Sequence, residues 1–195
     1  MTLLRDHPRP TERLILRPWR EEDRLPFAEM NADPRVMEFM PRLLTKEESE
    51  DFFDRIQAHF DLHGFGLWAA EHRATGAFMG FIGLFVPGFE APFMPAVEIG
   101  WRLRHEFWGC GYATEGAREI VRYAFDVLCL PALVSFTMPS NVRSRGVMEK
   151  LGMTRDPSAD FDHPRVPIGH PMRRHVLYRL PASKLPVNLS PNVHQ

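Results

Sequence analysis

Two glycines precede a helical pattern near the middle of the chain, in the stretch W-G-C-G-Y-A-T-E-G-A-R-E at 108–119. Apolar residues then recur at the spacing of one helix face: Ala113, Ala117, Ile120, Val121, Ala124, Phe125 and Leu128. A glycine loop that opens a helix offers unpaired N–H groups and the positive end of the helix dipole to an anion. The pattern predicts either a phosphate-binding loop or an ordinary turn before an amphipathic helix over 113–128.

The common nucleotide-binding motifs do not fit this loop. A dinucleotide-binding loop has a third glycine at the position of Thr114 and an acidic residue at the end of the next strand, where this chain has T-M-P at 137–139. A P-loop needs Gly-Lys-Ser or Gly-Lys-Thr, and the sequence contains neither. Both nucleotide hypotheses are therefore poor.

The loop follows a segment that alternates as a strand does. In V-E-I-G-W-R-L-R at 97–104 the odd positions are apolar and the even positions are mixed. Glu98 lies on the mixed face, eleven residues before Gly109. The segment therefore predicts a strand with one apolar face and one mixed face.

The other strands are predicted from β-rich runs bounded by turn residues. Thr75-Gly76 indicates a hairpin between two of them. The segment 156–171 is Pro-rich and irregular, and the chain beyond 181 is expected to be a polar tail. The predicted strands cover 13–17, 67–71, 78–85, 132–137 and 174–180.

Three further helices are predicted, over 21–31, from Thr45 to Gly64, and over 141–151. Thr45 with Glu48 three residues later forms a capping box, and Gly64 is a natural helix end. Leu25 and Leu62 are expected among the apolar contacts of the first two helices. The order of all elements indicates one α/β (α+β) domain over 11–180 with a largely antiparallel first half.

Composition narrows the function. A chain of 195 residues with 44% hydrophobic and 25% charged residues suits one soluble domain. The net charge of -1 gives no basic field for nucleic acid, and no segment reaches the length of a membrane span. Cys110 and Cys129 are too few for a disulfide scaffold, and the first ten residues lack the apolar core of a signal peptide. A cytoplasmic protein is expected.

Four segments in order resemble the GNAT acetyltransferases: E-I-G-W at 98–101, W-G-C-G-Y-A-T-E at 108–115, N-V-R-S at 141–144 and M-E-K-L-G-M at 148–153. The opening T-E-R-L-I-L-R-P-W at 11–19 more narrowly resembles the ribosomal-protein-alanine (RimJ/RimL-type) branch. The resemblance implies a GNAT-like mixed, largely antiparallel central sheet with helices on both faces.

The resemblance also implies acetyl-CoA as co-substrate and no metal. The family motif Gln/Arg-x-x-Gly-x-Gly/Ala falls on Trp108, Gly111 and Ala113, so the leading polar residue is absent. Gly111, without a Cβ, would let the backbone approach the pyrophosphate. The residues expected to bind the cofactor are Ile99, Trp101, Gly109, Cys110, Gly111, Tyr112, Ala113, Thr114, Asn141 and Ser144.

Acetyl transfer to an amine needs a neutral amine, a donor to the thioester carbonyl and a proton for the leaving thiolate. The resemblance implies a backbone N–H near 99–101 for the carbonyl. Glu98 is the candidate general base, or else a solvated or ion-paired carboxylate. Asn141 would hold the pantetheine arm, cap its helix, or do both. Many proteins of the family that this chain resembles place a tyrosine on the last helix as the general acid, but positions 147–150 contain none here, so Ser144 or water is expected to be the acid.

Several other residues have less specific patterns. His59 and His63 lack the glutamate of a zinc-protease motif, so no metal site is expected there. Cys110 occupies a variable motif position, which argues against a catalytic thiol. The aromatic residues Phe39 and Phe89, with the loop 88–95, either pack in the core or wall the acceptor pocket. The segment 156–171 either shapes acceptor specificity or covers the sheet.

The predicted function is direct transfer of an acetyl group to a primary amine on a small molecule or a protein N-terminus. A different acyl-CoA donor and a non-catalytic acyl-CoA sensor are the alternatives. The near-neutral charge disfavours docking to a ribosome. Arg143, Arg145 and Lys150 are expected to bind the 3′-phosphate of the cofactor. A homodimer would be in keeping with the resemblance.

Overall fold

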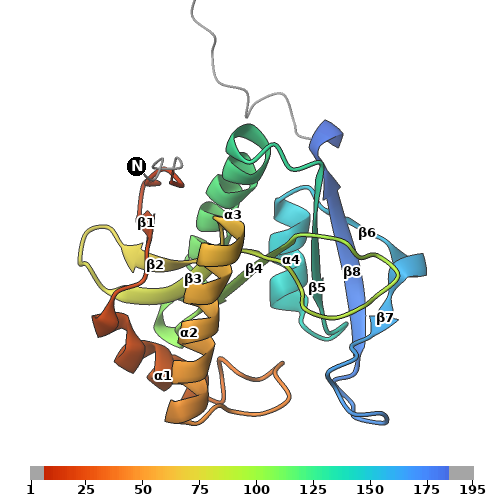
Figure 1. The fold of residues 1–195 in the computed structure, drawn as a ribbon, viewed down its shortest axis with the longest axis horizontal. Coiled ribbons are helices and arrows are strands. Elements are labelled where there is room, and N and C mark those ends of the chain that lie inside the picture. Colours follow the sequence, from red (N-terminus) through yellow and green to blue (C-terminus); the bar gives the residue numbers. More distant parts are fainter. Residues whose placement is uncertain (1–6, 185–195) are drawn as a thin grey trace, which may run out of the picture.

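A computed structural model describes residues 7–184, which fold around one mixed sheet with the strand order β1-β2-β3-β4-β5-β8-β6, and β7 pairs with β8 (Figure 1). All pairs are antiparallel except β4 with β5, which confirms the predicted sheet. The strands are β1 (Leu14–Arg17), β2 (Leu67–His72), β3 (Phe78–Phe85), β4 (Glu98–Leu103), β5 (Ala132–Thr137), β6 (Thr154–Arg155), β7 (Phe161–Asp162) and β8 (Arg174–Pro181).

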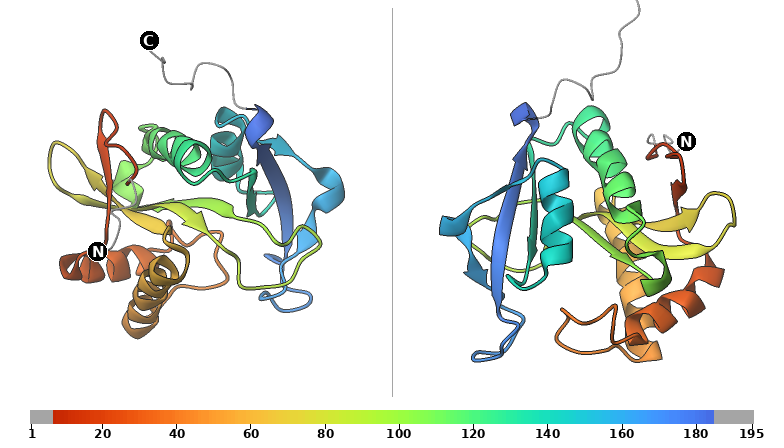
Figure 2. Two further views of the ribbon diagram at one scale, coloured as in Figure 1. Left: turned by 45° about the horizontal axis from the view of Figure 1, so that its top comes forward. Right: turned by 180° about the vertical axis from the view of Figure 1, so that it is seen from behind.

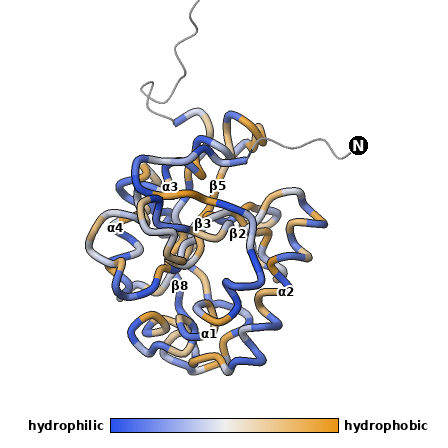
Figure 3. The backbone as a smooth tube through the Cα atoms, turned by 90° about the vertical axis from the view of Figure 1, so that its left-hand side faces the viewer, coloured by the Kyte–Doolittle hydropathy of each residue, from blue (hydrophilic) through white to orange (hydrophobic). Residues whose placement is uncertain are grey.

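Helices cover both faces of the sheet, as predicted. Helices α1 (Arg24–Ala32) and α2 (Lys46–His63) lie on one side, and α3 (Tyr112–Arg122) and α4 (Val142–Lys150) on the other (Figure 2). Along α1 and α2 hydrophilic and hydrophobic stretches alternate (Figure 3), and the apolar positions include Phe27, Met30, Phe53 and Ile56, which are buried. Each face of the sheet therefore has its own core.

The ends of α2 are set by the residues that the sequence indicated. The Thr45 side chain accepts a hydrogen bond from the Glu48 amide, and Gly64 ends the helix in the left-handed region at φ 71°. Two apolar predictions are wrong: Leu62 is 78% exposed and Leu25 is 62% exposed. Both residues were expected to be buried because they are hydrophobic, but neither lies on the buried face of its helix.

Helix α3 differs from the prediction in length. The α-helical part ends at Arg122, and Tyr123–Val127 continues as a π-helical turn in which the Leu128 amide bonds to the Tyr123 carbonyl at 3.1 Å. Gly116 sets the contact of α3 with the sheet, because a Cβ there would lie 2.4 Å from Cδ1 of Ile82. The helix therefore lies close on β3.

Strands β4 and β5 separate soon after they meet. Their pairing registers Glu98 with Val134, and the Val134 amide donates to the Val97 carbonyl at 2.9 Å. Beyond this point β5 continues beside β8 and β4 beside β3. The sheet opens between them, which leaves backbone groups of β4 without a neighbouring strand.

The irregular segment before β8 contains more order than predicted, since β7 and a 3-10 turn at Pro157–Ala159 lie within 156–171. Two-residue strands carry too little alternation to be recognised in a sequence. Pro181 ends β8, and the rest of the predicted tail beyond 184 lies outside the described residues. Within 7–184 no helix combines the length and apolarity needed to cross a bilayer.

Candidate active site

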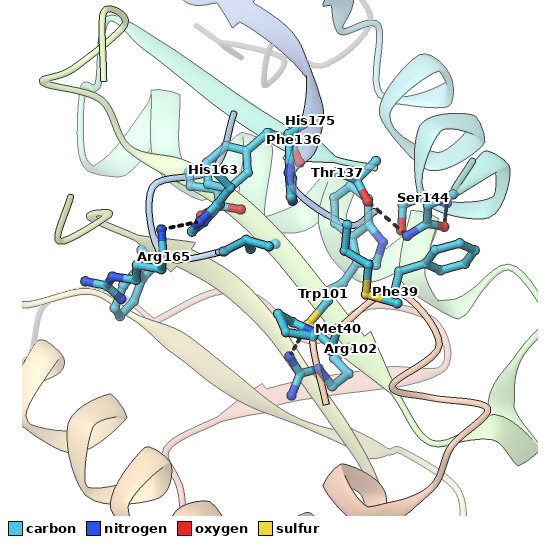
Figure 4. Close-up of a pocket in the computed structure, with 18 of the residues that line it drawn as sticks. Phe39, Met40, Trp101, Arg102, Phe136, Thr137, Ser144, His163, Arg165 and His175 are labelled. Atoms are coloured by element: carbon cyan, nitrogen blue, oxygen red, sulfur yellow. Dashed lines mark hydrogen bonds between the residues drawn. The ribbon is translucent and has the colours of Figure 1, made fainter. Parts of the chain in front are cut away.

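Two cavities meet where β4 and β5 separate. The sheet cavity has a volume of about 340 Å³ and is lined by β4, β5 and the segment before β8 (Figure 4). The loop cavity has a volume of about 410 Å³ and is lined by the glycine loop and the first turns of α3 and α4. Residues that line both are Phe39, Met40, Trp101, Arg102, Asn141 and Ser144.

The loop cavity contains the backbone device that the sequence indicated. Gly109 and Gly111 have φ angles of +76° and +84°, which non-glycine residues rarely adopt, and Gly111 is the N-cap of α3. The first N–H groups of a helix have no partner within it. Tyr112, Ala113 and Thr114 line this cavity, so their N–H groups and the helix dipole are available to an anion there.

The expected cofactor residues do not all reach the cavities. Gly109 and Gly111 line the loop cavity, whereas the Cys110 side chain is exposed and its carbonyl accepts from Nη1 of Arg13 at 3.0 Å. Ile99 is fully buried in the core on the α3 side and lines neither cavity. These two side chains therefore do not face either cavity.

The segment just before β1 supports the glycine loop and the first turn of α3, which sequence reasoning missed. Glu115 accepts hydrogen bonds from the Thr11 hydroxyl at 2.6 Å, the Arg13 amide at 2.8 Å and the Arg13 Nε at 2.7 Å. The Arg13 guanidinium also lies 4.5 Å from the centre of the Tyr112 ring. These contacts join segments about a hundred residues apart, so no local pattern could have indicated them.

Two of the three expected basic residues border the loop cavity. Arg143 and Lys150 line it, and the Arg143 guanidinium lies 4.7 Å from the centre of the Trp108 ring and pairs with Glu38. Arg145 lines neither cavity, because it bonds to the Tyr178 hydroxyl and to the Pro139 carbonyl. The basic rim is thus smaller than the sequence suggested.

Asn141 and Ser144 lie at the junction of the cavities. The Asn141 Oδ1 accepts from the Ser144 amide at 3.1 Å, and its Nδ2 donates to the Thr137 hydroxyl at 3.0 Å. Asn141 is therefore the cap of α4, one of the two roles considered for it. The Ser144 hydroxyl makes no hydrogen bond with another described residue, so it is free to contact a ligand.

The opening of the sheet exposes one backbone donor of β4. Odd-numbered residues of β4 direct their backbone groups toward β5, as the Val134–Val97 bond shows. In a parallel pair that includes Glu98 and Val134, the Ile99 amide faces the Val134 carbonyl. The Trp101 amide is the next donor on this edge, and β5 has already turned away there.

Glu98 is a carboxylate without a partner. It lines the sheet cavity, and burial raises its pKa to about 8. Within residues 7–184 its carboxylate makes no hydrogen bond or ion pair, so it is not the ion-paired strand carboxylate considered from the sequence. A carboxylic group with a pKa near 8 can exchange a proton with an amine.

Two histidines line the sheet cavity: His163 belongs to the segment 156–171 that was considered for acceptor specificity, whereas His175 was not expected. His163 and His175 lie with their ring centres 5.1 Å apart on the far side of the cavity from Arg102 (Figure 4). Burial lowers the pKa of His163 to about 4 and also lowers the pKa of His175. Both rings are therefore neutral near pH 7. No spacing in the sequence distinguishes them from the other histidines of the chain.

Some of the aromatic residues line the cavities, and others pack behind the residues that line them. Phe39 lines both cavities, whereas Phe89 and Phe93 do not line either and instead pack against Phe136, Phe161 or both. The loop 88–95 thus supports the cavity wall from behind. His59 is likewise structural: its Nδ1 lies 2.9 Å from the Phe65 carbonyl, and its Nε2 accepts from the Val86 amide at 3.0 Å.

Comparison with known proteins identifies the class to which this fold and site belong. The family model described as Acetyltransferase (GNAT) domain matches residues 13–154. The chain therefore belongs to the GNAT acetyltransferase family, whose members use acetyl-CoA as co-substrate.

Individual relatives agree with this class. The chain is 38% identical over 157 residues to the FsC-acetyl coenzyme A-N(2)-transacetylase of Aspergillus fumigatus, covering 74% of this chain and 63% of that protein. It is 31% identical over 144 residues to the uncharacterized protein YkkB of Bacillus subtilis, covering 73% of this chain and 83% of that one. An acetyltransferase structure from Agrobacterium tumefaciens superposes with a TM-score of 0.71 at 30% identity, covering 90% of this chain and 94% of that chain.

Proposed function

We propose that this protein transfers an acetyl group from acetyl-CoA to a primary amine within a ternary complex, without a covalent enzyme intermediate. The observation that carries the proposal is the meeting of the two cavities at Trp101 and Ser144. One cavity presents helix N–H groups suited to a pyrophosphate, and the other contains the unpaired Glu98. A thioester at the junction would face an amine in the sheet cavity.

The proposed chemistry assigns one task to each group. The amine nitrogen attacks the thioester carbon while the Trp101 amide donates to the carbonyl oxygen, which becomes the oxyanion. Glu98 accepts the proton that the amine releases, directly or through water. As the carbon–sulfur bond breaks, Ser144 or water supplies the proton to the thiolate. Tyr112 is not the acid in this scheme, because its hydroxyl lies 3.2 Å from Nε2 of His72.

The resemblance to the ribosomal-protein-alanine branch of the family rests on the segment 11–19. Structures named for ribosomal-protein acetyltransferases from Vibrio cholerae and Vibrio fischeri are 16% and 14% identical to this chain, which supports the fold alone. The name of the 38% identical relative includes acetyl coenzyme A and transacetylase, which supports acetyl as the transferred group. Because the net charge of -1 disfavours docking to an RNA-rich surface, we favour a small-molecule amine over a ribosomal protein as acceptor.

The test combines binding and turnover. Acetyl-CoA should raise the melting temperature, and a panel of amines should release free coenzyme A at rates above the hydrolysis blank. The binding-only alternative predicts the thermal shift without release by any amine. Absence of the thermal shift would overturn the proposal that the protein binds acetyl-CoA. A faster reaction with a longer acyl-CoA would show that this compound, and not acetyl-CoA, is the preferred donor.

A further inference from the structure

The charged side chains that line the sheet cavity indicate which class of acceptor amine it can bind. Among its described lining residues Glu98 is the sole carboxylate, and Arg102 and Arg165 carry guanidinium groups. The imidazoles of His163 and His175 add no charge near pH 7, because burial lowers their pKa values. A polyamine needs several carboxylates to balance its charges. This cavity has more cationic than anionic groups.

Arg102 is a cation without a counterion. Its Nη1 donates to Oδ1 of Asn31 at 2.7 Å, and its Nη2 contacts the Met40 sulfur at 3.2 Å, a weak acceptor. Its guanidinium also lies 5.4 Å from the centre of the Phe81 ring and 5.7 Å from that of Phe52. No carboxylate of residues 7–184 forms an ion pair with it. Burial lowers its pKa to about 10, the direction expected of an uncompensated charge.

The position of Arg102 suits contact with the acceptor. Glu98, Gly100 and Arg102 share one face of β4, and the end residues are about 13 Å apart along a strand. A Cβ added at Gly100 would meet nothing within 4 Å, so the floor between the two charged residues is open. An acceptor on this floor can bind Arg102 while its amine lies beside the junction, from which the amine proton can pass to Glu98 through water.

The walls of the sheet cavity are apolar. Phenylalanine and methionine side chains surround the charged floor, and the volume of about 340 Å³ suits a small molecule. The apolar members of the wall are Phe39, Met40, Phe52, Phe81, Phe85, Phe136, Met148, Val166 and Met172. An acceptor with an apolar body would fill this space, whereas a fully polar one would leave it poorly packed.

We infer that the acceptor is a small amine with an apolar body and one carboxylate, and that Arg102 binds this carboxylate. The inference rests on the proposed acetyl transfer. A guanidinium matches a carboxylate through two parallel hydrogen bonds, and it has free N–H groups here beyond those given to Asn31 and Met40. Bound in this way, the acceptor supplies a counterion that residues 7–184 do not provide.

The experiment compares amines that differ in the carboxylate. L-Phenylalanine is measured against 2-phenylethylamine, L-methionine against 3-(methylthio)propylamine, and spermine serves as a polycation; release of free coenzyme A is followed. The carboxylate member of each pair should have a kcat/KM about 10- to 100-fold higher, the range of a charge-assisted hydrogen-bond pair. Preference for the decarboxylated amines or for spermine would overturn the inference.

Variants test whether Arg102 causes the preference for amines that carry a carboxylate. Arg102→Gln should abolish it by lowering kcat/KM for the carboxylate members alone, with the KM for acetyl-CoA unchanged. Arg104→Gln is the matched control, because Arg104 pairs with Glu29 and Glu106 and lines neither cavity. A purely structural Arg102 would lower both members of each pair equally, and a cofactor-binding Arg102 would raise the KM for acetyl-CoA. Either outcome overturns the inference.

Failure of turnover is distinguishable from failure of the inference. If no amine releases coenzyme A, the proposed function fails, and calorimetric titration with the same pairs in the presence of coenzyme A still measures the preference. Tighter binding of L-phenylalanine than of 2-phenylethylamine by the wild type, lost in Arg102→Gln, would support the carboxylate site. Equal binding of both by the wild type would overturn it.

Discussion

The loop cavity and the sheet cavity meet at the same residues, but different kinds of groups build them. The loop cavity presents backbone N–H groups held by Gly109 and Gly111 within a few consecutive residues. The sheet cavity is made of side chains from many separate parts of the chain: the segment 39–41, α2, β2, β3, β4, β5, α4 and the segment 163–175. A ligand common to a family can be bound by backbone, which tolerates changes of side chain. A ligand particular to one protein depends on side chains brought together by the whole fold.

The largest effect is expected at the loop cavity. Gly111→Trp places a bulky side chain at φ +84° in the cofactor path and strains the backbone. The thermal shift with acetyl-CoA should disappear. Gly146→Ala is the control, since Gly146 lies in α4 away from both cavities and an added Cβ meets nothing within 4 Å. A full shift in Gly111→Trp would remove this loop as the cofactor site.

A loss of rate without loss of binding is expected at the sheet cavity. Glu98→Gln should lower kcat by roughly 100-fold or more, the usual contribution of a general base. Wild-type kcat at saturating acceptor should rise through about pH 8, the pKa to which burial raises Glu98, and the variant should lack this rise. An unchanged rate and pH profile would exclude Glu98 as the base.

The same carboxylate links pH to folding. Between its usual pKa and about 8 the folded state holds a proton on Glu98 that the unfolded state has lost. The contribution of Glu98 to the free energy of unfolding therefore falls as pH rises across this range. Denaturant titrations should show a smaller fall for Glu98→Gln. An identical pH dependence in the two proteins would show that burial does not shift this group.

An intermediate effect is expected at the junction. Asn141→Ala removes the cap of α4 and the bond to Thr137, so the free energy of unfolding should fall by about 1 kcal/mol. Asn141→Asp keeps the acceptor of the cap and should lose less. If Asn141 also holds the pantetheine arm, the KM for acetyl-CoA should rise in both variants. An unchanged KM for acetyl-CoA would show that Asn141 caps α4 and does not hold the pantetheine arm.

The smallest effect is expected at the basic rim. Arg143→Gln should weaken coenzyme A binding by about fivefold, as for an exposed ion pair, and should leave binding of dephospho-coenzyme A unchanged. Arg145→Gln serves as the comparison, because that side chain is engaged with Tyr178 and Pro139. Equal losses for both ligands in Arg143→Gln would exclude a contact with the 3′-phosphate.

The contrast between the cavities also explains what the sequence could predict. The strand positions, the capping box at Thr45 and the glycine loop depend on neighbours within a few residues, so periodicity and residue type indicated them. The π-helical turn after Arg122 could not be predicted in this way, because the periodic apolar stripe of the sequence continues through it unchanged. Arg13 beside the loop and His163 beside the sheet cavity depend on contacts between distant segments, which one sequence does not encode locally.

The strand order has a consequence for the growing polypeptide. Strand β8 is the last strand within residues 7–184, yet it lies between β5 and β6 and pairs with the whole of β5 through residues 176–181. Until residues 174–181 leave the ribosome, β5 has an unpaired edge, and its residues Leu133, Val134 and Ser135 lack the cover that buries them in the finished protein. Unpaired apolar edges are sites of misassociation. Stalling of synthesis before β8 should therefore yield aggregation-prone chains, whereas release of the full chain should not.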